Sequence, residues 1–495
     1  MGFKDFMRRK LRSFLQIENP QQNLITLSNL TDFETECYIN RVWSWGDKEA
    51  LEQLYKQLTN MSTRLNFWSA SPSFGMVKRH TGVPELIVDV LTNIVVGDLN
   101  TIKVENRMAE WEQILDKLNI EDLLSDAVKE VLVVGDGAFR ISINKAISEY
   151  PIVDFLSGEN VEFHYTKSIV SEVVFKSTIT FGHKRYQFEE TYGYGYIISK
   201  LYDGDNEISL TTLPQTKDIQ ECIEFDKSVM MAVPFIVFKS SRFKGRGKSI
   251  YAGKHDSFDS LDETWSQWMM AVRHGGAKEY IPENLLPRDP DTGMVLKPNP
   301  FDHSFIQVES QLIEGQASKI EVEQPSIPTS NYLETYITAL DLALQGIISP
   351  STLGIDTKKL DNGEAQREKE KTTLYTRNKI VSTLQEVLPI LVNMILGTYD
   401  ISNGTKPNKY DVEVPFGEYA NPSFESQVET VAKAKGSNIM SIETAVDELY
   451  GDTKNEEWKA EEVKRIKEQN GVMTTDEESV GMSLGADMTK AVNEV

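Results

Sequence analysis

The residues from Gly245 to Ser249 have the clearest chemical pattern in the sequence, because they end in Gly-Lys-Ser, the last part of a phosphate-binding loop. Such a loop holds phosphate oxygens with backbone amides and needs a further glycine five residues before Gly247. Arg242 occupies that position, and the residues after Ser249 do not predict a helix start that would present amides to a phosphate. The pattern therefore does not indicate nucleotide binding.

The same stretch is strongly basic and contains no acidic residue. Its basic positions are Lys239, Arg242, Lys244, Arg246 and Lys248. One interpretation is a solvated loop, and the other is a contact with a neighbouring acidic subunit or with DNA phosphates. The sequence leaves both open.

Other patterns do not complete a known site. Gly135-Asp136-Gly137 lacks the third glycine of a dinucleotide fingerprint, and a strand is predicted where that fingerprint needs a helix. Asp203 and Asp205 start like a calcium loop, but Ile208 stands at the glycine position. The 6 histidines have no metal-ligand spacing, and there is no nucleophile elbow. We therefore predict no metal, no other cofactor and no enzyme activity.

The composition is that of a soluble globular protein of several domains. The chain has 495 residues, of which 40% are hydrophobic and 26% charged. The formal net charge of -23 argues against a broad basic face that grips duplex DNA, although an acidic channel lining would let DNA slide. Cys37 and Cys222 are the only cysteines, which indicates a reducing compartment.

No segment of the sequence predicts a membrane association. Residues 1–15 carry five basic residues among apolar ones, without an uninterrupted apolar core, and predict a short amphipathic helix instead of a signal peptide. The longest largely apolar stretch, residues 387–396, is too short to span a bilayer.

The first half of the chain predicts one α+β domain. Helices are expected over residues 85–96 and 121–133. Strands are expected over residues 138–143, 169–175, 194–202 and 231–238. Asp203-Gly204, between two β-rich runs, predicts a hairpin.

The middle of the chain predicts two helices with matching apolar seams. Phe258, Leu261, Trp265, Trp268 and Val272 form the first seam, and Leu333, Ile337, Leu340, Leu344 and Ile347 form the second. Between them lies a Pro-rich stretch with two short alternating runs, 304–310 and 319–324, that predict a small hairpin. An antiparallel pair capped by this excursion is one interpretation, and two ordinary core helices are the other. The positions expected to be exposed are acidic: Asp259, Asp262, Glu263, Glu334 and Asp341.

A polar loop over residues 349–363 leads into a long helix from about Glu364, which Pro389 should kink. A strand over residues 410–414 is expected to return to the sheet of the first domain.

The C-terminal part predicts acidic helices, one capped by Ser441 and another over residues 455–469 with Glu461 placed to pair with Arg465.

The order of these elements resembles the portal, or head–tail connector, family of tailed bacteriophages. The resemblance lies in the loop 245–249 leading into Ser260-Leu261-Asp262-Glu263, then Trp265-Ser266-Gln267 and Arg273. It continues with Tyr280-Ile281-Pro282, with Leu333 to Ile348 followed by Ser349, Leu353 and Gly354, and with residues 364–377. Residues 441–446 and 461–466 resemble the family's crown, and residues 84–89 match its wing more weakly. The ordered set spans most of residues 84–470.

The resemblance implies an α+β portal fold with an α/β wing, a two-helix stem, a small β-containing clip, a long kinked helix and a helical crown. The implied parts are an N-terminal wing 1–245, loop and first stem helix 246–280, clip 281–327, second stem helix 328–348, tunnel loop 349–363, long helix and return to the wing 364–420, and crown with C-terminal tail 421–495.

The resemblance also implies a function. A ring of usually twelve subunits would form a channel at one capsid vertex of the virion, assembled in the host cytoplasm, for packaging and ejection of double-stranded DNA. Implied partners are terminase, head–tail adaptor, capsid and scaffolding proteins, with no membrane. The tunnel-loop residues expected to approach DNA are Asp356, Lys358, Lys359, Asp361 and Asn362. The alternatives are a nucleotide-dependent DNA packaging or processing enzyme and another capsid-shell protein.

Overall fold

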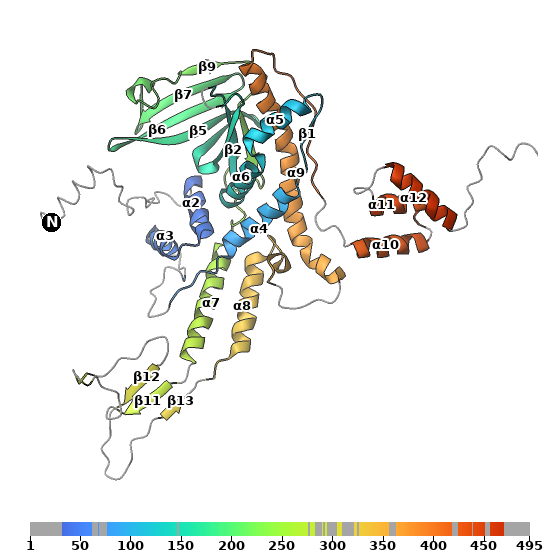
Figure 1. Ribbon diagram of the computed structural model, residues 1–495. Coiled ribbons are helices and arrows are strands. Elements are labelled where there is room, and N and C mark those ends of the chain that lie inside the picture. Colours follow the sequence, from blue (N-terminus) through green and yellow to red (C-terminus); the bar gives the residue numbers. More distant parts are fainter. Residues whose placement is uncertain are drawn as a thin grey trace, which may run out of the picture. The chain divides into compact units, whose positions relative to one another are not determined.

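A computed structural model describes residues 32–61, 68, 77–145, 148–275, 278–282, 290, 293–294, 304–308, 321–323, 326–355, 363–417, 424–437, 439–450 and 456–469. The chain contains both helices and sheets and is α+β (Figure 1). It divides into two compact units, Met1–Gly417 (unit 1) and Glu418–Val495 (unit 2).

The first part of unit 1 is largely helical. Its helices are α2 (Phe33–Trp45), α3 (Lys48–Met61), α4 (Val83–Gly97), α5 (Met108–Leu118) and α6 (Ile120–Val134). Pro84 lies in the first turn of α4, where its missing amide hydrogen costs no helical hydrogen bond. The apolar sides of α4 and α6 are buried, as the periodicity of residues 85–96 and 121–133 predicts.

Two antiparallel sheets follow. A three-stranded sheet has the order β10-β2-β3, from β2 (Asp136–Ser142), β3 (Ile152–Ser157) and β10 (Ala232–Ile236). A second sheet has the order β4-β5-β6-β7-β8, from β4 (Val161–Thr166), β5 (Ile169–Phe181), β6 (Lys184–Gly193), β7 (Tyr196–Asp203) and β8 (Asn206–Ile208), with β9 (Cys222–Glu224) also paired to β7. The predicted hairpin at Asp203-Gly204 is confirmed as the β7–β8 turn.

The long helix α9 (Gly363–Ser402) runs through the core of unit 1. One side of the helix is apolar and buried, with Val381, Leu384, Leu388, Leu391 and Ile395. The helix continues through Pro389, and the Asn393 side chain donates to the Pro389 carbonyl at 2.8 Å. Residues 370–402 are long and apolar enough to cross a membrane, but 67% of the apolar window is buried inside the protein, which is typical of a core helix.

The strand expected to return to the first sheet was predicted wrongly. β14 (Val412–Glu413) pairs with β1 (Lys103–Val104) in a separate two-stranded sheet. The Tyr410 amide donates to Asn393 Oδ1 at 2.7 Å, which fastens the chain to α9 just before β14 begins. The apolar pattern identified a strand but could not identify its partner.

Helices α7 (His255–His274) and α8 (Thr329–Leu344) are joined through strands β11 (Lys278–Pro282), β12 (Ser304–Val308) and β13 (Glu321–Glu323). The predicted hairpin of the two alternating runs is wrong, because β12 and β13 do not pair with each other. Both pair with β11, β12 in parallel and β13 antiparallel. β11 covers Tyr280-Ile281-Pro282, whose proline masked its strand character in the sequence.

Unit 2 consists, in its described residues, of α10 (Phe424–Gly436), α11 (Ile442–Tyr450) and α12 (Glu456–Gln469). The Ser441 hydroxyl accepts from the Thr444 amide at 3.2 Å, so the predicted cap is confirmed. Arg465 pairs with Glu461 at 2.9 Å, also as predicted. The Tyr450 and Trp458 rings meet at 5.1 Å and join α11 to α12.

Candidate functional site

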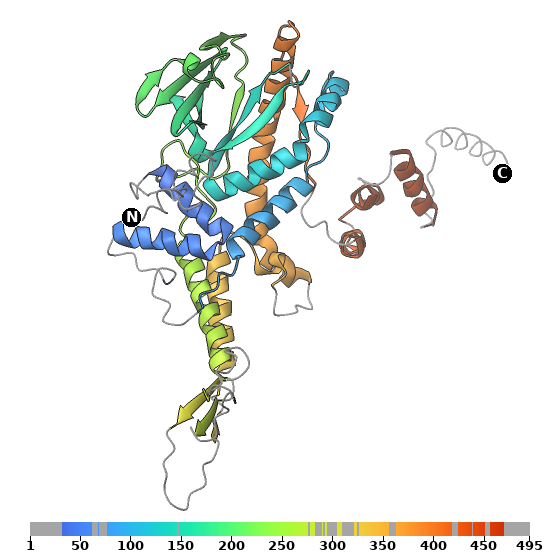
Figure 2. The same cartoon turned by 60° about the vertical axis from the view of Figure 1, so that its left-hand side comes forward.

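Helices α7 and α8 lie side by side in both views, with β11, β12 and β13 at one end (Figures 1 and 2). The chain runs outward along α7, through the strands and back along α8, so the two helices are antiparallel. Aromatic rings fill their interface: Trp268 stacks on Tyr332 at 6.5 Å, and Trp265 meets Tyr336 at 5.6 Å. We call this arrangement the α7/α8 pair.

The inner end of the α7/α8 pair is rooted in the core of unit 1. Phe258, Leu261, Leu340 and Leu344 are buried there. The Lys254 ammonium donates to the Leu342 carbonyl at 2.9 Å and ties the start of α7 to the end of α8. The interpretation of two matched helices around an excursion is therefore confirmed for the described residues.

The pair leaves apolar residues in solvent on its outward-facing sides. Val272 is 46%, Leu333 44% and Leu342 53% exposed. Val272 and Leu333 belong to the predicted seams, and within one chain they are not buried. The aromatic rings already fill the space between the helices, which leaves these aliphatic side chains outside it.

The acidic positions Asp259 and Asp262 were predicted to be exposed, and this is wrong. Both side chains are buried, Asp259 beside Trp68 and Asp262 beside His80 and Thr81. Asp262 accepts from the Thr81 amide at 2.9 Å and lies 2.7 Å from His80 Nδ1, while Asp259 accepts from the Trp68 amide at 2.7 Å. The two carboxylates accept hydrogen bonds from the Trp68 and Thr81 amides, which would otherwise need water as their partner.

The sequence carried a signal for this contact. Asp259 and Asp262 each follow a buried seam residue by one position, and Ser266 continues the same side of α7 one turn later. The Ser266 hydroxyl accepts from the Arg79 amide at 2.8 Å. A polar stripe directly beside an apolar seam indicates a face packed against backbone, and residues 77–82, which occupy this face, were missed.

The other acidic positions remain accessible. Glu334 and Asp341 are exposed on α8, and Glu263 is half-buried on α7, where it accepts from Gln267 at 2.8 Å. Burial, and then the nearby Asp259 carboxylate, raise the pKa of Glu263. Of the five predicted acidic positions, these three keep a side chain that solvent can reach.

The basic loop is not simply solvated. Arg246 is held against the buried Asp136 carboxylate, with Nη2 to Oδ1 at 2.8 Å and Nε to Oδ2 at 2.9 Å. Its guanidinium also donates to the carbonyls of Val161 and Gly158 and lies 3.9 Å from the Phe33 ring centroid. Arg242 pairs with Glu36 at 2.8 Å. Arg246 therefore fits neither of the two interpretations left open for this loop, since its partners lie inside the protein, whereas Arg242, Lys239, Lys244 and Lys248 are exposed.

The two glycine-rich motifs of the sequence meet each other. The Gly247 amide donates to Asp136 Oδ2 at 2.6 Å, and the Lys248 amide donates to the Phe238 carbonyl at 2.7 Å. A side chain at Gly135, whose φ is 121°, would lie 2.9 Å from the Gly247 backbone. These amides are already used inside the protein, so the Gly-Lys-Ser stretch has no phosphate cradle here.

The predicted tunnel-loop residues Asp356, Lys358, Lys359, Asp361 and Asn362 lie outside the described residues. The chain just before them forms the short helix η6 (Pro350–Leu353), which is fastened to α9. The Thr373 hydroxyl accepts from the Ser349 amide at 2.9 Å and lies 2.8 Å from the Thr352 hydroxyl. Residues 349–353 are therefore held against α9.

A hollow of about 580 Å³ lies between α8, η6 and α9. Its lining is mostly apolar and includes Trp268, Tyr336, Leu340, Ile355 and Thr372. Among the described residues, no group of three or more His, Cys, Asp or Glu side chains could hold a metal ion.

Comparisons with known proteins give little. No protein-family model matches the chain, and no curated protein is similar to it. Among solved structures, a chain from the "Neck of native GTA particle computed with C12 symmetry" is similar over 74% of this chain and 89% of its own length, at 11% identity and a TM-score of 0.37.

Proposed function

We propose that this chain is a structural subunit of a phage-type portal, a ring-shaped channel at one capsid vertex through which double-stranded DNA is packaged and ejected. The observation that supports it best is the α7/α8 pair, an antiparallel helix pair rooted in the core and ended by a small three-stranded sheet. The fastened residues 349–353, the long helix α9 and a separate helical unit follow in the order that portals have.

The exposed apolar residues on the α7/α8 pair favour assembly into a ring. Val272, Leu333 and Leu342 are roughly half exposed, and burying such side chains against a neighbour releases about 25 cal/mol per Å² of apolar surface. A contact between different faces of identical subunits closes into a ring when the rotation per subunit allows it. A ring of twelve such subunits is the expected form.

The accessible acidic residues of α8 suit a channel that does not retain DNA. Glu334 and Asp341 are exposed on the same helix, and the whole chain carries a formal charge of -23. Carboxylates that face DNA phosphates repel them, so the duplex slides instead of binding. Glu263 belongs to this accessible set. Asp259 and Asp262 do not, because their carboxylates accept hydrogen bonds from backbone amides.

The proposed partners follow from this role. Terminase would dock at the β11–β13 end during packaging, and a head–tail adaptor would replace it afterwards. Capsid and scaffolding proteins would meet the subunit during assembly in the host cytoplasm, and the finished ring belongs to the virion.

Electron microscopy of the purified full-length protein tests the proposal. Negative-stain images together with mass photometry should give closed rings with a central hole, and the rings should not hydrolyse ATP. Large curved shells would identify a capsid-shell protein, and a monomer that hydrolyses ATP would identify an enzyme. Either result rejects the portal role.

A matched pair of variants connects the ring to the α7/α8 pair. Leu333→Asp with Leu342→Asp places charges on exposed positions of this pair and should leave folded subunits that do not close into rings. The control is Ile169→Asp, because Ile169 is 72% exposed on β5 and lies outside the pair. Equal ring formation by both proteins would show that the pair is not the interface.

DNA handling is tested in particles assembled with variant subunits. Glu334→Gln with Asp341→Asn should slow packaging, since the duplex would bind the channel more tightly. Deletion of residues 357–362 should impair packaging or retention of DNA. Normal packaging by the first variant would reject the electrostatic role of α8, and normal packaging and retention after the deletion would reject the role of the loop.

A further inference from the structure

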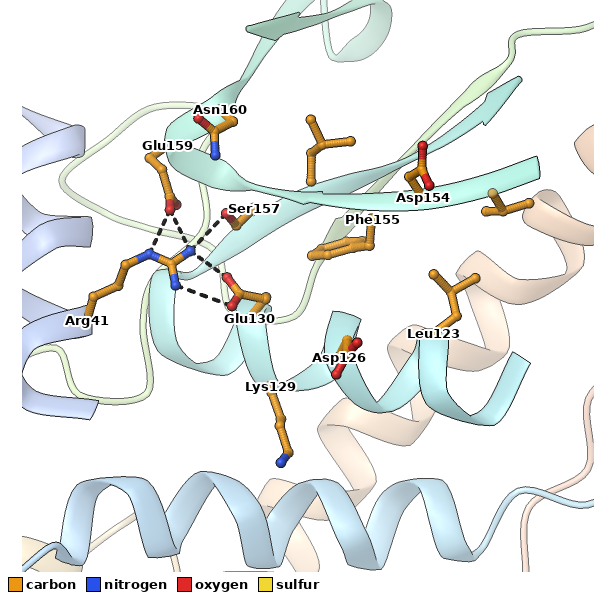
Figure 3. A pocket seen from close by; sticks show the side chains of 12 residues that line it. Arg41, Leu123, Asp126, Lys129, Glu130, Asp154, Phe155, Ser157, Glu159 and Asn160 are labelled. Atoms are coloured by element: carbon orange, nitrogen blue, oxygen red, sulfur yellow. Dashed lines mark hydrogen bonds and ion pairs between the residues drawn. The ribbon is translucent and has the colours of Figure 1, made fainter. Parts of the chain in front are cut away.

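A cleft of about 680 Å³ opens on unit 1 beside the three-stranded sheet. Its walls come from α2, α6, β3 and the short helix η3 (Gly158–Asn160). The lining residues are Arg41, Leu123, Asp126, Lys129, Glu130, Val153, Asp154, Phe155, Leu156, Ser157, Glu159 and Asn160 (Figure 3). We call it the acidic cleft, because it contains four carboxylates and two basic side chains, a formal charge of 2 − 4 = −2.

The two basic side chains of the acidic cleft are already paired. Arg41 reaches from α2 to Glu130 and Glu159, both at 2.5 Å, and donates to the Ser157 hydroxyl at 2.9 Å (Figure 3). Lys129 points away from this cluster and pairs with Asp89 at 2.8 Å. Both basic side chains are therefore already neutralised by carboxylates, so they add little repulsion toward an incoming positively charged group.

Three carboxylates of the acidic cleft can still accept hydrogen bonds or ion pairs after these pairs are formed. Glu159 Oε2 is buried and has no hydrogen-bond partner among the described residues. Asp126 is exposed at the cleft, and Asp154 shares a single 3.1 Å contact with Arg140. A buried carboxylate oxygen without a donor costs free energy, so the site gains when a cation or N–H group reaches it.

The acidic cleft also has apolar walls, formed by Leu123, Val153, Phe155 and Leu156. A small cation would satisfy the carboxylates and leave these side chains in water. A ligand that covers both needs basic groups beside apolar ones, the composition of a basic amphipathic helix.

The chain itself contains such a segment. In residues 3–15 the apolar side chains Phe3, Met7, Leu11, Phe14 and Leu15 recur at helical spacing, and Lys4, Arg8, Arg9, Lys10 and Arg12 lie among them. These residues lie outside the described part of the structure, which begins at Asp32.

The point where the described chain begins lies close to the acidic cleft. Asp32 and Glu159 line one hollow of about 520 Å³, and Glu159 also lines the acidic cleft. Residues 16–31 separate the basic segment from Asp32, and a chain of that length reaches up to roughly 50 Å when extended. The segment can therefore reach the cleft of its own subunit.

We propose that residues 3–15 of the same chain dock in the acidic cleft, with basic side chains toward Asp126, Asp154 and Glu159 and apolar side chains against Phe155 and Leu156. The proposal is independent of ring formation, because every group it uses belongs to one subunit. It gives the basic N-terminal segment an internal acceptor and keeps it from DNA or a lipid surface.

Disulfide trapping in the full-length protein tests this docking. Cys222→Ser removes the exposed cysteine and leaves the buried Cys37. Arg9→Cys is then combined with Asp126→Cys at the cleft or with Asp205→Cys, an exposed control position in the β7–β8 turn. Mild oxidation should cross-link the cleft pair within one chain at least 10-fold faster than the control pair, and about 1 M salt should reduce the difference by screening the ion pairs.

The opposite outcomes are equally clear. Equal rates for the two pairs, or no cross-link at the cleft, overturn the proposal. Cross-links between two chains would assign the cleft to a second copy and also overturn it. A second measurement needs no cysteine: amide exchange of residues 153–160 should become faster in the variant Met7→Ser, Arg8→Glu, Arg12→Glu than in the unaltered chain. Unchanged exchange there counts against docking.

Discussion

Arg246 and Asp136 form a buried ion pair at the point where two glycine-rich stretches cross. The Asp136 side chain is fully buried and accepts three hydrogen bonds, two from the Arg246 guanidinium and one from the Gly247 amide. The pair neutralises both charges and satisfies a backbone amide, and so holds residues 246–247 at the start of β2.

Removing one partner of this pair should lower the free energy of unfolding by several kcal/mol. Asp136→Ala leaves the Arg246 guanidinium and the Gly247 amide without their acceptor, and such a loss typically costs about 3–5 kcal/mol. Urea unfolding of the variant measures it. The matched control is Arg242→Ala, which breaks the exposed pair with Glu36 and should change stability by less than about 1 kcal/mol. Similar losses for the two variants would contradict this assignment.

His255 should make the stability depend on pH in a defined window. Its imidazole lies 2.9 Å from Asn40 Oδ1 and stacks against Trp43, and burial lowers its pKa from 6.5 to about 4. The unfolded chain takes up a proton as the pH falls through 6.5, whereas the folded chain does not until about 4. Stability is therefore lost on acidification below 6.5, and nothing changes above it.

Between about pH 7 and pH 5 this histidine should remove about 2 kcal/mol of unfolding free energy. The measurement is urea unfolding at both pH values for the natural chain and for His255→Gln. The variant should lose less stability between the two values by that amount. An identical loss in both proteins would show that His255 is protonated in the folded state.

At the scale of elements, the sequence predicted those whose pattern is local. The helical spacing at Phe258 and Leu261 and the Asp203-Gly204 turn identified α7 and the β7–β8 hairpin. What the sequence could not give was the partner of each element, because pairing is decided by residues far away in the chain. β11 between β12 and β13, and β14 against β1, are such cases.

The same limit applies to the candidate site. The sequence shows that α7 carries acidic side chains, but not which way they point. Asp259 and Asp262 accept from the amides of Trp68 and Thr81, 191 and 181 residues away in the chain. The arginines of the basic loop were likewise visible as charge, while their acceptor Asp136 belonged to a different motif.

The contact between α7 and residues 77–82 should depend on Asp262. Asp262→Ala removes the acceptor of the Thr81 amide and hydroxyl and the partner of His80, at a cost of about 1–3 kcal/mol. Hydrogen exchange at the Thr81 amide should become at least 10-fold faster. Asp341→Ala on the exposed side of α8 serves as the control and should leave this amide unchanged. Slow exchange at Thr81 in Asp262→Ala would mean that another group holds the segment.

At the scale of the whole molecule, the formal charge of -23 acts against any assembly of identical subunits. Each subunit that joins a ring brings the same charge close to its neighbours, and salt screens that repulsion. The apolar contacts proposed for the α7/α8 pair do not weaken in moderate salt. Assembly should therefore be stronger at higher ionic strength.

Mass photometry at about 0.05 M and about 0.5 M NaCl measures this, and the ring fraction should rise with salt. Leu333→Asp with Leu342→Asp provides the control, since it should remain unassembled in both buffers. Rings that fall apart as salt is raised would indicate an interface held mainly by ion pairs, and would contradict the apolar one.

The residue that follows α7 and a residue just before α8 are in contact, at the point where the chain leaves the helices for β11, β12 and β13. A side chain at Gly275 would lie 2.2 Å from Ile327 Cδ1, so the residue after α7 and the residue shortly before α8 are in direct contact. The two ends of α7 and α8 are therefore close enough for a short turn to join them, and a chain with such a turn in place of residues 276–326 should keep both helices.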